Sequence, residues 1–117
     1  MLMGLGALAT VASKRPSNLA ITVIDNEHYG ETGMQPTHTS AGVDLAGIAC
    51  TCGFRQTATV RQMRELDAAV AMLHTADGPV LVVLKVSAAR DPLVLPSWDG
   101  ALLKSRFRQV LLGAQAA

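Results

Sequence analysis

Three short runs rich in apolar and β-branched residues alternate along the chain with longer stretches of helical periodicity. The runs are Leu19–Ile24, Gln56–Val60 and Val80–Val86. Their length and their β-branched content predict that each forms a strand. The first run is apolar at almost every position, so we expect its strand to be buried on both faces of a sheet.

Stretches with an apolar residue at every third or fourth position predict four helices. Asp44 and Gly53 bracket the second helix as an N-cap and a C-terminal glycine. In the last two helices the apolar positions form one face. The first helix is expected to end near Lys14, and the other three are expected to cover Leu45–Cys52, 61–75 and about 101–112. The apolar face of the third helix consists of Leu66, Ala69, Val70 and Leu73, and that of the fourth consists of Leu103, Phe107, Val110 and Leu111.

The order of the predicted elements is α-β-α-β-α-β-α, which is typical of an α/β fold. Alternating strands and helices of these lengths predict a three-layer α/β/α domain with a mainly parallel sheet. A polar loop, residues 26–43, follows the first strand. Because such sheets usually begin with a strand, we expect that the first strand is missing before Met1 or is supplied by another chain, and that 1–117 form a single, incomplete domain.

Composition narrows the classes of partner. Of the 117 residues, 50% are hydrophobic and 16% are charged, and the net charge is +1 without a basic block. This gives no electrostatic reason to expect binding to nucleic acid or to an anionic membrane.

The apolar N-terminus is too short to span a bilayer, and its cations follow the apolar part, unlike in a signal peptide. Cys50 and Cys52 are too close for an ordinary disulfide and lack a second pair for zinc, so we expect reduced thiols in the cytoplasm.

Candidate chemistry begins where the first strand ends, at Asp25 and Asn26. Ligands of open α/β sheets bind beyond the carboxyl ends of the strands. The amide oxygen of Asn26 and nearby backbone carbonyls are ligands that suit a hard cation such as Mg²⁺. The alternative is a simple polar turn in which Asn26 binds loop amides, and spacing alone leaves both interpretations open.

The segment LMGLGALATVASKRPSNLAITVIDNEHYGETG resembles the diphosphate-binding half of thiamine-diphosphate-dependent enzymes. The fingerprint of that family is Gly-Asp-Gly, then fewer than about thirty residues that end in an apolar strand, then Asn-Asn or a variant such as Asp-Asn. Here Asp25 and Asn26 close it, and Tyr29-Gly30 also matches. The segments GETGMQPTHTSAGVDLAGIACTCGF and LPSWDGALLKSRFRQVLLG are most similar to decarboxylases of phosphonopyruvate or sulfopyruvate, so the resemblance covers nearly the whole chain.

The resemblance implies a site for thiamine diphosphate and Mg²⁺. Asn26 would bind the metal through its side-chain oxygen, and His28 would bind it through its backbone carbonyl. The metal would bridge the two phosphates of the cofactor. The residues that would line the diphosphate are Leu2, Asn26, Glu27, His28, Tyr29 and Gly30.

The resemblance also implies a substrate-facing loop and a partner. A small anionic 2-oxo acid would meet the loop, but no catalytic residue is assigned. The acidic residue that activates the cofactor in this family lies on the pyrimidine-binding half, so we expect a pyrimidine-binding domain or an alpha subunit of the same enzyme as the partner. The substrate candidates are Thr32, Gly33, Met34, Gln35 and His38, with Thr37 and Thr39 as further hydrogen-bond donors.

The chain departs from the family pattern because the Gly-Asp-Gly motif is absent. We expect that motif just upstream of Met1, and therefore weak or no cofactor binding and no activity by the isolated chain. A missing strand would expose a sheet edge and apolar helix faces, which predicts a homo-oligomer. Two alternatives stay open: a carboligase or oxidase subunit of the same family, and a degenerate module that binds without catalysis.

Overall fold

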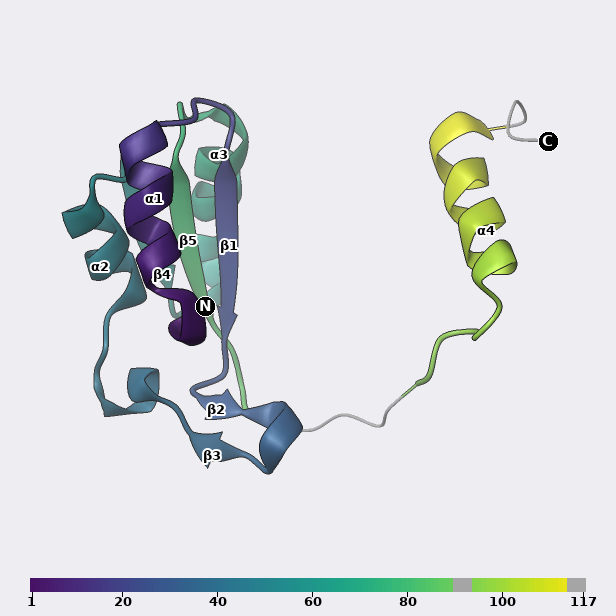
Figure 1. The fold of residues 1–117 in the computed structure, drawn as a ribbon, viewed down its shortest axis with the longest axis horizontal. Coiled ribbons are helices and arrows are strands. Elements are labelled where there is room, and N and C mark those ends of the chain that lie inside the picture. The colour runs from purple at the N-terminus through teal and green to yellow at the C-terminus, as the bar shows by residue number, and fades with distance from the viewer. Residues whose placement is uncertain (90–93, 114–117) are drawn as a thin grey trace.

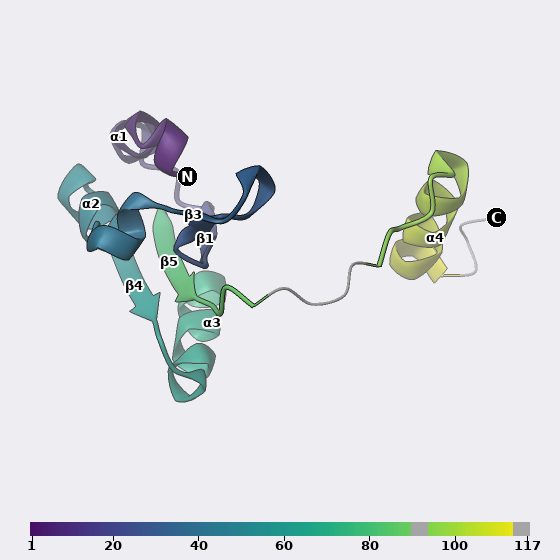
Figure 2. The same cartoon turned by 90° about the horizontal axis from the view of Figure 1, so that it is seen from below.

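The computed structural model describes residues 1–89 and 94–113. The elements of its main body are α1 (Gly6–Lys14), β1 (Ala20–Asp25), α2 (Leu45–Cys52), β4 (Gln56–Val60), α3 (Leu66–Thr75) and β5 (Val80–Lys85). The three strands are parallel, in the order β1-β5-β4. Helices α1 and α2 lie on one face of the sheet and α3 lies on the other (Figures 1 and 2). This confirms the three-layer α/β/α arrangement with a parallel sheet.

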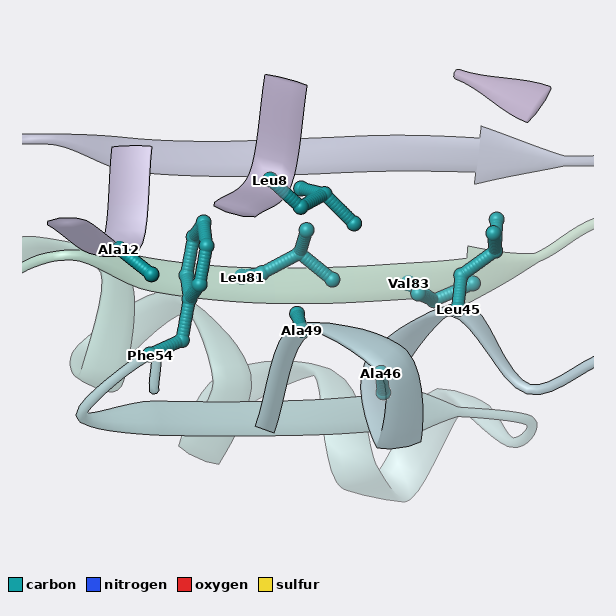
Figure 3. Close-up of a cluster of buried hydrophobic side chains, with 8 residues drawn as sticks. All are labelled: Leu8, Ala12, Leu45, Ala46, Ala49, Phe54, Leu81 and Val83. Carbon is teal, nitrogen blue, oxygen red and sulfur yellow. The ribbon is translucent and has the colours of Figure 1, made fainter. Parts of the chain in front are cut away.

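The central strand β5 supplies both halves of the hydrophobic core. Its side chains alternate between the two faces, so Leu81 and Val83 point toward α1 and α2, whereas Val80 and Val82 point toward α3. Figure 3 shows the first cluster, in which Leu81 packs among side chains of both helices. The other members of that cluster are Leu8, Ala12, Leu45, Ala46, Ala49 and Phe54, and Val60 and Ala69 belong to the second.

The prediction that the first strand is buried on both faces is wrong. Strand β1 lies at an edge of the sheet, with Ile21 and Val23 half-buried against the α1 side. On its other face Thr22 is exposed and Ile24 is 63% exposed. Helix α3 packs mainly beneath β4 and β5 (Figure 2), which leaves this part of β1 uncovered. Val70, expected on the buried face of α3, is also 43% exposed.

The polar loop is more regular than the sequence indicated. It contains two short antiparallel strands, which lie beyond the carboxyl end of β1 (Figure 1). Two 3₁₀ helices accompany them, and together these elements shape the end of the sheet where ligands of α/β proteins bind. The strands are β2 (His28–Tyr29) and β3 (Gln35–Pro36), and the 3₁₀ helices are η2 (Gly30–Thr32) and η3 (His38–Ala41), while a further one, η1 (Leu2–Gly4), precedes α1.

The helix predicted over 61–75 begins later than expected. A 3₁₀ turn, η4 (Met63–Glu65), comes first, and α3 itself starts at Leu66. The carboxylate of Glu65 accepts hydrogen bonds from the backbone N–H groups of Arg61 and Gln62, at 2.8 and 3.1 Å. This contact is part of a capping box at the start of the helical segment, and it satisfies backbone donors that have no intrahelical partner.

The last helix, α4 (Gly100–Leu112), forms close to the predicted place but does not pack as its pattern indicated. Asp99 caps it, since its Oδ1 accepts the N–H groups of Ala101 and Leu102 at 2.9 and 3.1 Å. Every residue of α4 is exposed, including Phe107 at 64%, and the helix stands apart from the sheet (Figure 1). Within the described ranges, no helix combines the length and the apolar character needed to cross a bilayer.

Candidate functional site

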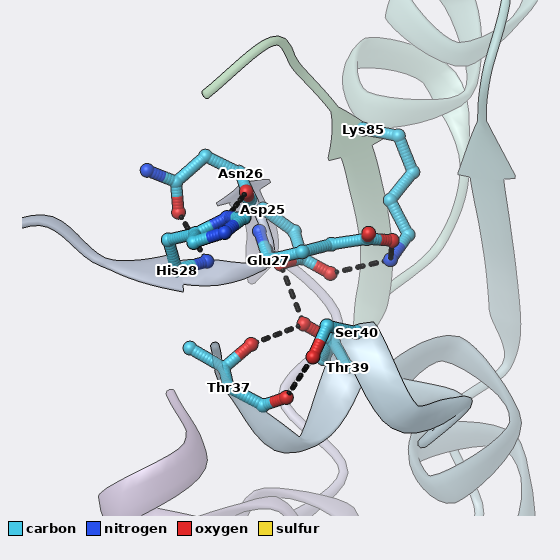
Figure 4. Close-up of polar contacts among 8 residues, drawn as sticks. All are labelled: Asp25, Asn26, Glu27, His28, Thr37, Thr39, Ser40 and Lys85. Carbon is cyan, nitrogen blue, oxygen red and sulfur yellow. Dashed lines mark hydrogen bonds and ion pairs between the residues drawn. The ribbon is translucent and has the colours of Figure 1, made fainter. Parts of the chain in front are cut away.

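Two adjacent parallel strands end in opposite charges. Asp25 ends β1 and Lys85 ends β5, and the two residues are paired in register. Lys85 Nζ lies 2.8 Å from Asp25 Oδ2 and 2.7 Å from Glu27 Oε1, so one cation contacts two carboxylates (Figure 4). The side chains of Asp25 and Lys85 are only 8% and 16% exposed. This partly buried ion-pair network fixes the carboxyl end of the sheet.

The carboxylate of Asp25 has three polar contacts. Besides Lys85, its Oδ1 accepts the hydroxyl of Thr39 at 2.8 Å and the backbone N–H of Glu27 at 2.9 Å. Burial alone would raise the pKa of Asp25, but the hydrogen bonds from Lys85, Thr39 and Glu27 outweigh it and hold this pKa below its ordinary value of 3.8. Asp25 is therefore ionised at neutral pH.

Lys85 is charged for the complementary reason. Burial alone would lower its pKa, but its hydrogen bonds with Asp25 and Glu27 keep this pKa above the ordinary value of 10.5. A buried charge is tolerated only when it is paired. The Lys85 side chain is thus a permanent cation that is already engaged by two partners.

The turn between Asp25 and β2 presents Asn26. The side-chain Oδ1 of Asn26 accepts the backbone N–H of His28 at 3.0 Å, and the Asn26 carbonyl accepts from His28 Nδ1 at 2.9 Å. Glu27 adopts a left-handed conformation with φ 62°, which is uncommon for a residue with a side chain. These contacts hold the turn in one conformation and direct Asn26 and Glu27 to opposite sides, as Figure 4 shows.

A cavity of about 300 Å³, called here the Asn26 cavity, lies beside this turn. It is bounded by the N-terminal residues of the chain, by the turn and by the segment after β3. The predicted cofactor residues Leu2, Asn26, His28 and Tyr29 all line it, together with Met1, Thr37 and Thr39. Residues distant in the sequence therefore meet at the carboxyl end of β1, where the pattern placed a ligand.

The oxygens at the Asn26 cavity fit a hard cation. The amide oxygen of Asn26 uses one lone pair for the His28 N–H, which leaves the other available. The carbonyls of Glu27 and Tyr29 accept from Thr37 and Met34 across the hairpin, both at 2.9 Å. Because carbonyls alternate along an extended strand, that of His28 is directed away from β3. Among the described residues no three His, Cys, Asp or Glu side chains cluster for a metal. The Asp25 carboxylate also borders the cavity but is already engaged by Lys85, Thr39 and the Glu27 N–H, so a cation here would depend on these neutral oxygens and on ligand phosphates.

Comparison with known proteins identifies the family. The C-terminal TPP binding domain of thiamine pyrophosphate enzymes matches residues 1–84. The chain belongs to this family. The resemblance in the sequence and the predicted fold class are thereby confirmed.

Curated relatives point to one branch of the thiamine pyrophosphate enzymes. The chain is 39% identical over 109 residues to phosphonopyruvate decarboxylase of Streptomyces viridochromogenes, which covers 92% of the chain and 27% of that enzyme. It is 32% identical over 114 residues to sulfopyruvate decarboxylase subunit beta of Methanothermobacter thermautotrophicus, covering 97% of the chain and 58% of that subunit. The corresponding subunit of Methanocaldococcus jannaschii is 40% identical over 67 residues, 57% of the chain and 35% of the subunit. The chain thus spans only part of the length of these relatives.

Two predicted cofactor residues of this family domain lie outside the Asn26 cavity. Glu27 points to the other side of the turn and lines a second cavity of about 260 Å³, together with Arg61 and Lys85. Gly30 starts η2 and lines neither cavity. Glu27 and Gly30 are therefore placed to shape the turn and the hairpin rather than to border the same space as Asn26.

The substrate candidates split into two groups. Thr32, Gly33 and Gln35 are exposed at the closed end of the hairpin, where the Thr32 hydroxyl donates to Gln35 Oε1 at 3.0 Å and Gln35 Nε2 donates to the Thr32 carbonyl at 2.7 Å. Neither they nor half-buried Met34 and exposed His38 border the Asn26 cavity. By contrast, the buried hydroxyls of Thr37 and Thr39, which are 2.7 Å apart, do border it.

Lys85 is the residue of this ion-pair network that the sequence did not single out. It is the first polar residue after the apolar run of β5, as Asp25 is after that of β1. Because parallel strands bring their carboxyl ends together, the two positions were bound to be neighbours once the strands were paired. The signal was present in the sequence, but it required the strand order, which places β5 beside β1.

Proposed function

We propose that this chain is the diphosphate- and magnesium-binding part of a thiamine-diphosphate-dependent decarboxylase, acting on a small 2-oxo acid such as phosphonopyruvate or sulfopyruvate. The observation that carries the proposal is that Leu2, Asn26, His28 and Tyr29 meet around one cavity at the carboxyl end of β1. The similarity to decarboxylases of these two substrates supports the reaction class.

In this proposal Asn26 Oδ1 and the His28 carbonyl hold Mg²⁺. Leu2 and Tyr29 border the diphosphate, and Glu27 and Gly30 shape the turn and the hairpin that face it. When bound, thiamine diphosphate supplies the carbon nucleophile that attacks the 2-keto carbon and the ring that accepts the electrons released with CO₂. The chain itself fixes the metal and the diphosphate, and its apolar N-terminal residues exclude water from one side of the cavity.

The substrate loop is the least constrained part of the proposal. Thr32, Gly33, Met34, Gln35 and His38 lie on an exposed hairpin and 3₁₀ turn, so they would meet the acid where a second chain covers the site. Thr37 and Thr39 are better placed for its anionic head, since both hydroxyls border the Asn26 cavity. The hydroxyl and imidazole groups of this segment all donate hydrogen bonds to anionic oxygens.

The proposal includes a partner that carries the pyrimidine-binding half, as a separate domain or an alpha subunit. Two of the relatives are named as beta subunits, which supports this division. Activity would then need the partner, because the acid that activates the aminopyrimidine in this family lies on the pyrimidine-binding half. The exposed apolar face of α4 also supports self-association, and the free thiols of Cys50 and Cys52 support work in the reducing cytoplasm.

Calorimetric titration of thiamine diphosphate with Mg²⁺ tests the proposal, with the chain alone and with a pyrimidine-binding partner. Asn26→Ala is expected to weaken binding at least tenfold, since it removes a metal ligand of the kind that octahedral Mg²⁺ requires. His28→Ala is expected to keep most of the affinity, because the proposed ligand is its backbone carbonyl. Asn18→Ala, on the exposed turn before β1, serves as the matched control.

Binding that needs Mg²⁺ and is lost only in Asn26→Ala would support the assignment. If Mg²⁺-thiamine diphosphate binds neither the chain with its partner nor a version extended upstream through a Gly-Asp-Gly motif, the proposed function is wrong. If Asn26→Ala and Asn18→Ala bind equally well, a site exists but Asn26 is not its metal ligand.

A further inference from the structure

Lys85 contacts the two residues that flank Asn26 in the chain. Its Nζ is 2.8 Å from Asp25 Oδ2 and 2.7 Å from Glu27 Oε1. Both contacts reach across about sixty residues of sequence, from the end of β5 to the end of β1. Nothing in the proposed binding of metal or diphosphate uses Lys85, so its two short contacts with the turn call for another explanation than direct binding.

The carboxylates on either side of Asn26 are held away from it. Asp25 uses Oδ2 for Lys85 and Oδ1 for Thr39 and for the Glu27 N–H. Glu27 has the left-handed backbone, and its side chain crosses to Lys85 while Asn26 extends in the other direction (Figure 4). Glu27 therefore lines only the second cavity, whereas the Asp25 carboxylate borders both cavities but is engaged by Lys85, Thr39 and the Glu27 N–H.

The charge of the turn depends on Lys85. Two carboxylates and one ammonium leave a single net negative charge, and removal of the ammonium would leave two unpaired carboxylates. Unpaired carboxylates are good ligands for divalent cations. They would also repel an anionic diphosphate brought to the neighbouring Asn26, because charges a few ångströms apart interact strongly in a partly buried site.

We propose that Lys85 is a positioning residue that withdraws Asp25 and Glu27 from divalent cations, so that the Asn26 turn accepts a cation only together with diphosphate. The proposal rests on the proposed function for the identity of the metal-diphosphate ligand. Lys85 acts through the two carboxylates and touches neither metal nor diphosphate. Without the Lys85 side chain, the turn prefers a bare cation to a metal-diphosphate complex.

The test compares two ligands on the same variants of the full chain. Mn²⁺ alone is titrated by electron paramagnetic resonance, and inorganic pyrophosphate with Mg²⁺ is titrated by calorimetry. Lys85→Met is expected to bind bare Mn²⁺ about tenfold more tightly than wild type and magnesium pyrophosphate about tenfold more weakly. Lys85→Arg, which keeps the charge, is expected to restore both affinities toward wild type. Lys14→Met, at the exposed end of α1, removes a lysine elsewhere and is expected to change neither.

If Lys85 had a purely structural role, its loss would weaken the binding of both ligands. The decisive result is therefore that the affinities for Mn²⁺ and for magnesium pyrophosphate change in opposite directions. The double variant Lys85→Met with Glu27→Gln is expected to lose the gain in Mn²⁺ affinity, because one unmasked carboxylate is gone. If Lys85→Met fails to fold by circular dichroism, Lys85→Gln keeps a hydrogen-bond donor without the charge and is expected to show the same gain.

Unchanged Mn²⁺ affinity in a folded Lys85→Met or Lys85→Gln variant would overturn the proposal. Failure of the proposed function looks different, because it is the absence of magnesium thiamine diphosphate binding in every variant, wild type included. The Mn²⁺ titration needs no cofactor, so it decides the role of Lys85 in either case.

Discussion

The hydroxyl of Thr39 donates a 2.8 Å hydrogen bond to Oδ1 of Asp25, joining η3 to the end of β1 across fourteen residues of chain. Both side chains are buried, at 5% and 8% exposure. Thr37 continues the contact, since its hydroxyl is 2.7 Å from that of Thr39. The loop after the hairpin is thus tied to the strand end by a short chain of polar atoms, which also forms one wall of the Asn26 cavity.

Thr39→Val tests this connection. The substitution keeps the shape of the side chain but removes a hydrogen bond to a charged acceptor, so we expect unfolding to become easier by about 1.5–3 kcal/mol. Thr39→Ser keeps the hydroxyl and is expected to lose less. Urea denaturation gives the free energies, with Thr22→Val on the exposed face of β1 as the control. A loss for Thr39→Val no larger than for Thr22→Val would contradict the account.

Glu65 makes the stability of the turn before α3 depend on pH. Its hydrogen bonds from the N–H groups of Arg61 and Gln62 hold its pKa below the ordinary value of 4.5. A carboxyl whose pKa is lower in the folded state stabilises the fold above its unfolded pKa, and this contribution is lost as the pH falls through the folded pKa.

The expected result is a pH-dependent difference between wild type and Glu65→Gln. The wild type should exceed the variant in stability at neutral pH, and the difference should shrink as the pH falls below 4.5. Asp25 titrates in both proteins, so its effect cancels in the difference. Thermal unfolding at a series of pH values measures this, and a difference that stays constant with pH would exclude the role of the Glu65 carboxylate.

Strands β1 and β5 differ in burial, which predicts that truncating a large apolar side chain to alanine costs more stability in β5 than in β1. Leu81 of β5 is fully buried at 0% exposure, whereas Ile24 of β1 is 63% exposed. Leu81→Ala is expected to lower the free energy of unfolding by about 2–5 kcal/mol, and Ile24→Ala by roughly 0.5 kcal/mol. Both variants remove the same number of carbon atoms, and urea denaturation compares them directly. A large loss for Ile24→Ala would mean that another element covers β1 in solution.

Much of this fold followed from the sequence because its signals were local. Apolar runs and periodic stretches placed the three strands and the helices within a few residues, and Gly53 ends α2 as expected. Burial was harder to predict. The run at Leu19–Ile24 looks fully buried, yet β1 is an edge strand, and edge position depends on strand order rather than on the run itself.

The candidate site was predictable where the motif was contiguous. Asn26 and His28 came directly from the segment after β1, and Leu2 followed from the resemblance. The contacts of Lys85 and Thr39 with Asp25 could not be found in the same way, because they depend on pairing β5 with β1 and on the path of η3. Glu27 lies outside the Asn26 cavity because a left-handed backbone, invisible in the sequence, directs its side chain toward Lys85.

The apolar face of helix α4 has no partner among the described residues. Leu103, Phe107 and Val110 are 40%, 64% and 84% exposed, and their spacing places them on the same side of the helix. Exposed apolar faces of this kind promote association, so we expect the chain to form dimers or larger oligomers. Such an oligomer would bury α4 against the uncovered part of β1, where Ile24 is exposed, or against a second α4.

Phe107→Glu is expected to shift this association toward the monomer by at least tenfold in dissociation constant, because it places a charge in the apolar face. Ser105→Glu adds the same charge to the opposite side of α4 and serves as the matched control. Sedimentation equilibrium measures both variants against wild type. If wild type is monomeric at high concentration, or if both substitutions act equally, α4 does not mediate self-association. If Phe107→Glu and Ile24→Glu both release the monomer and Ser105→Glu does not, then α4 docks on the exposed face of β1.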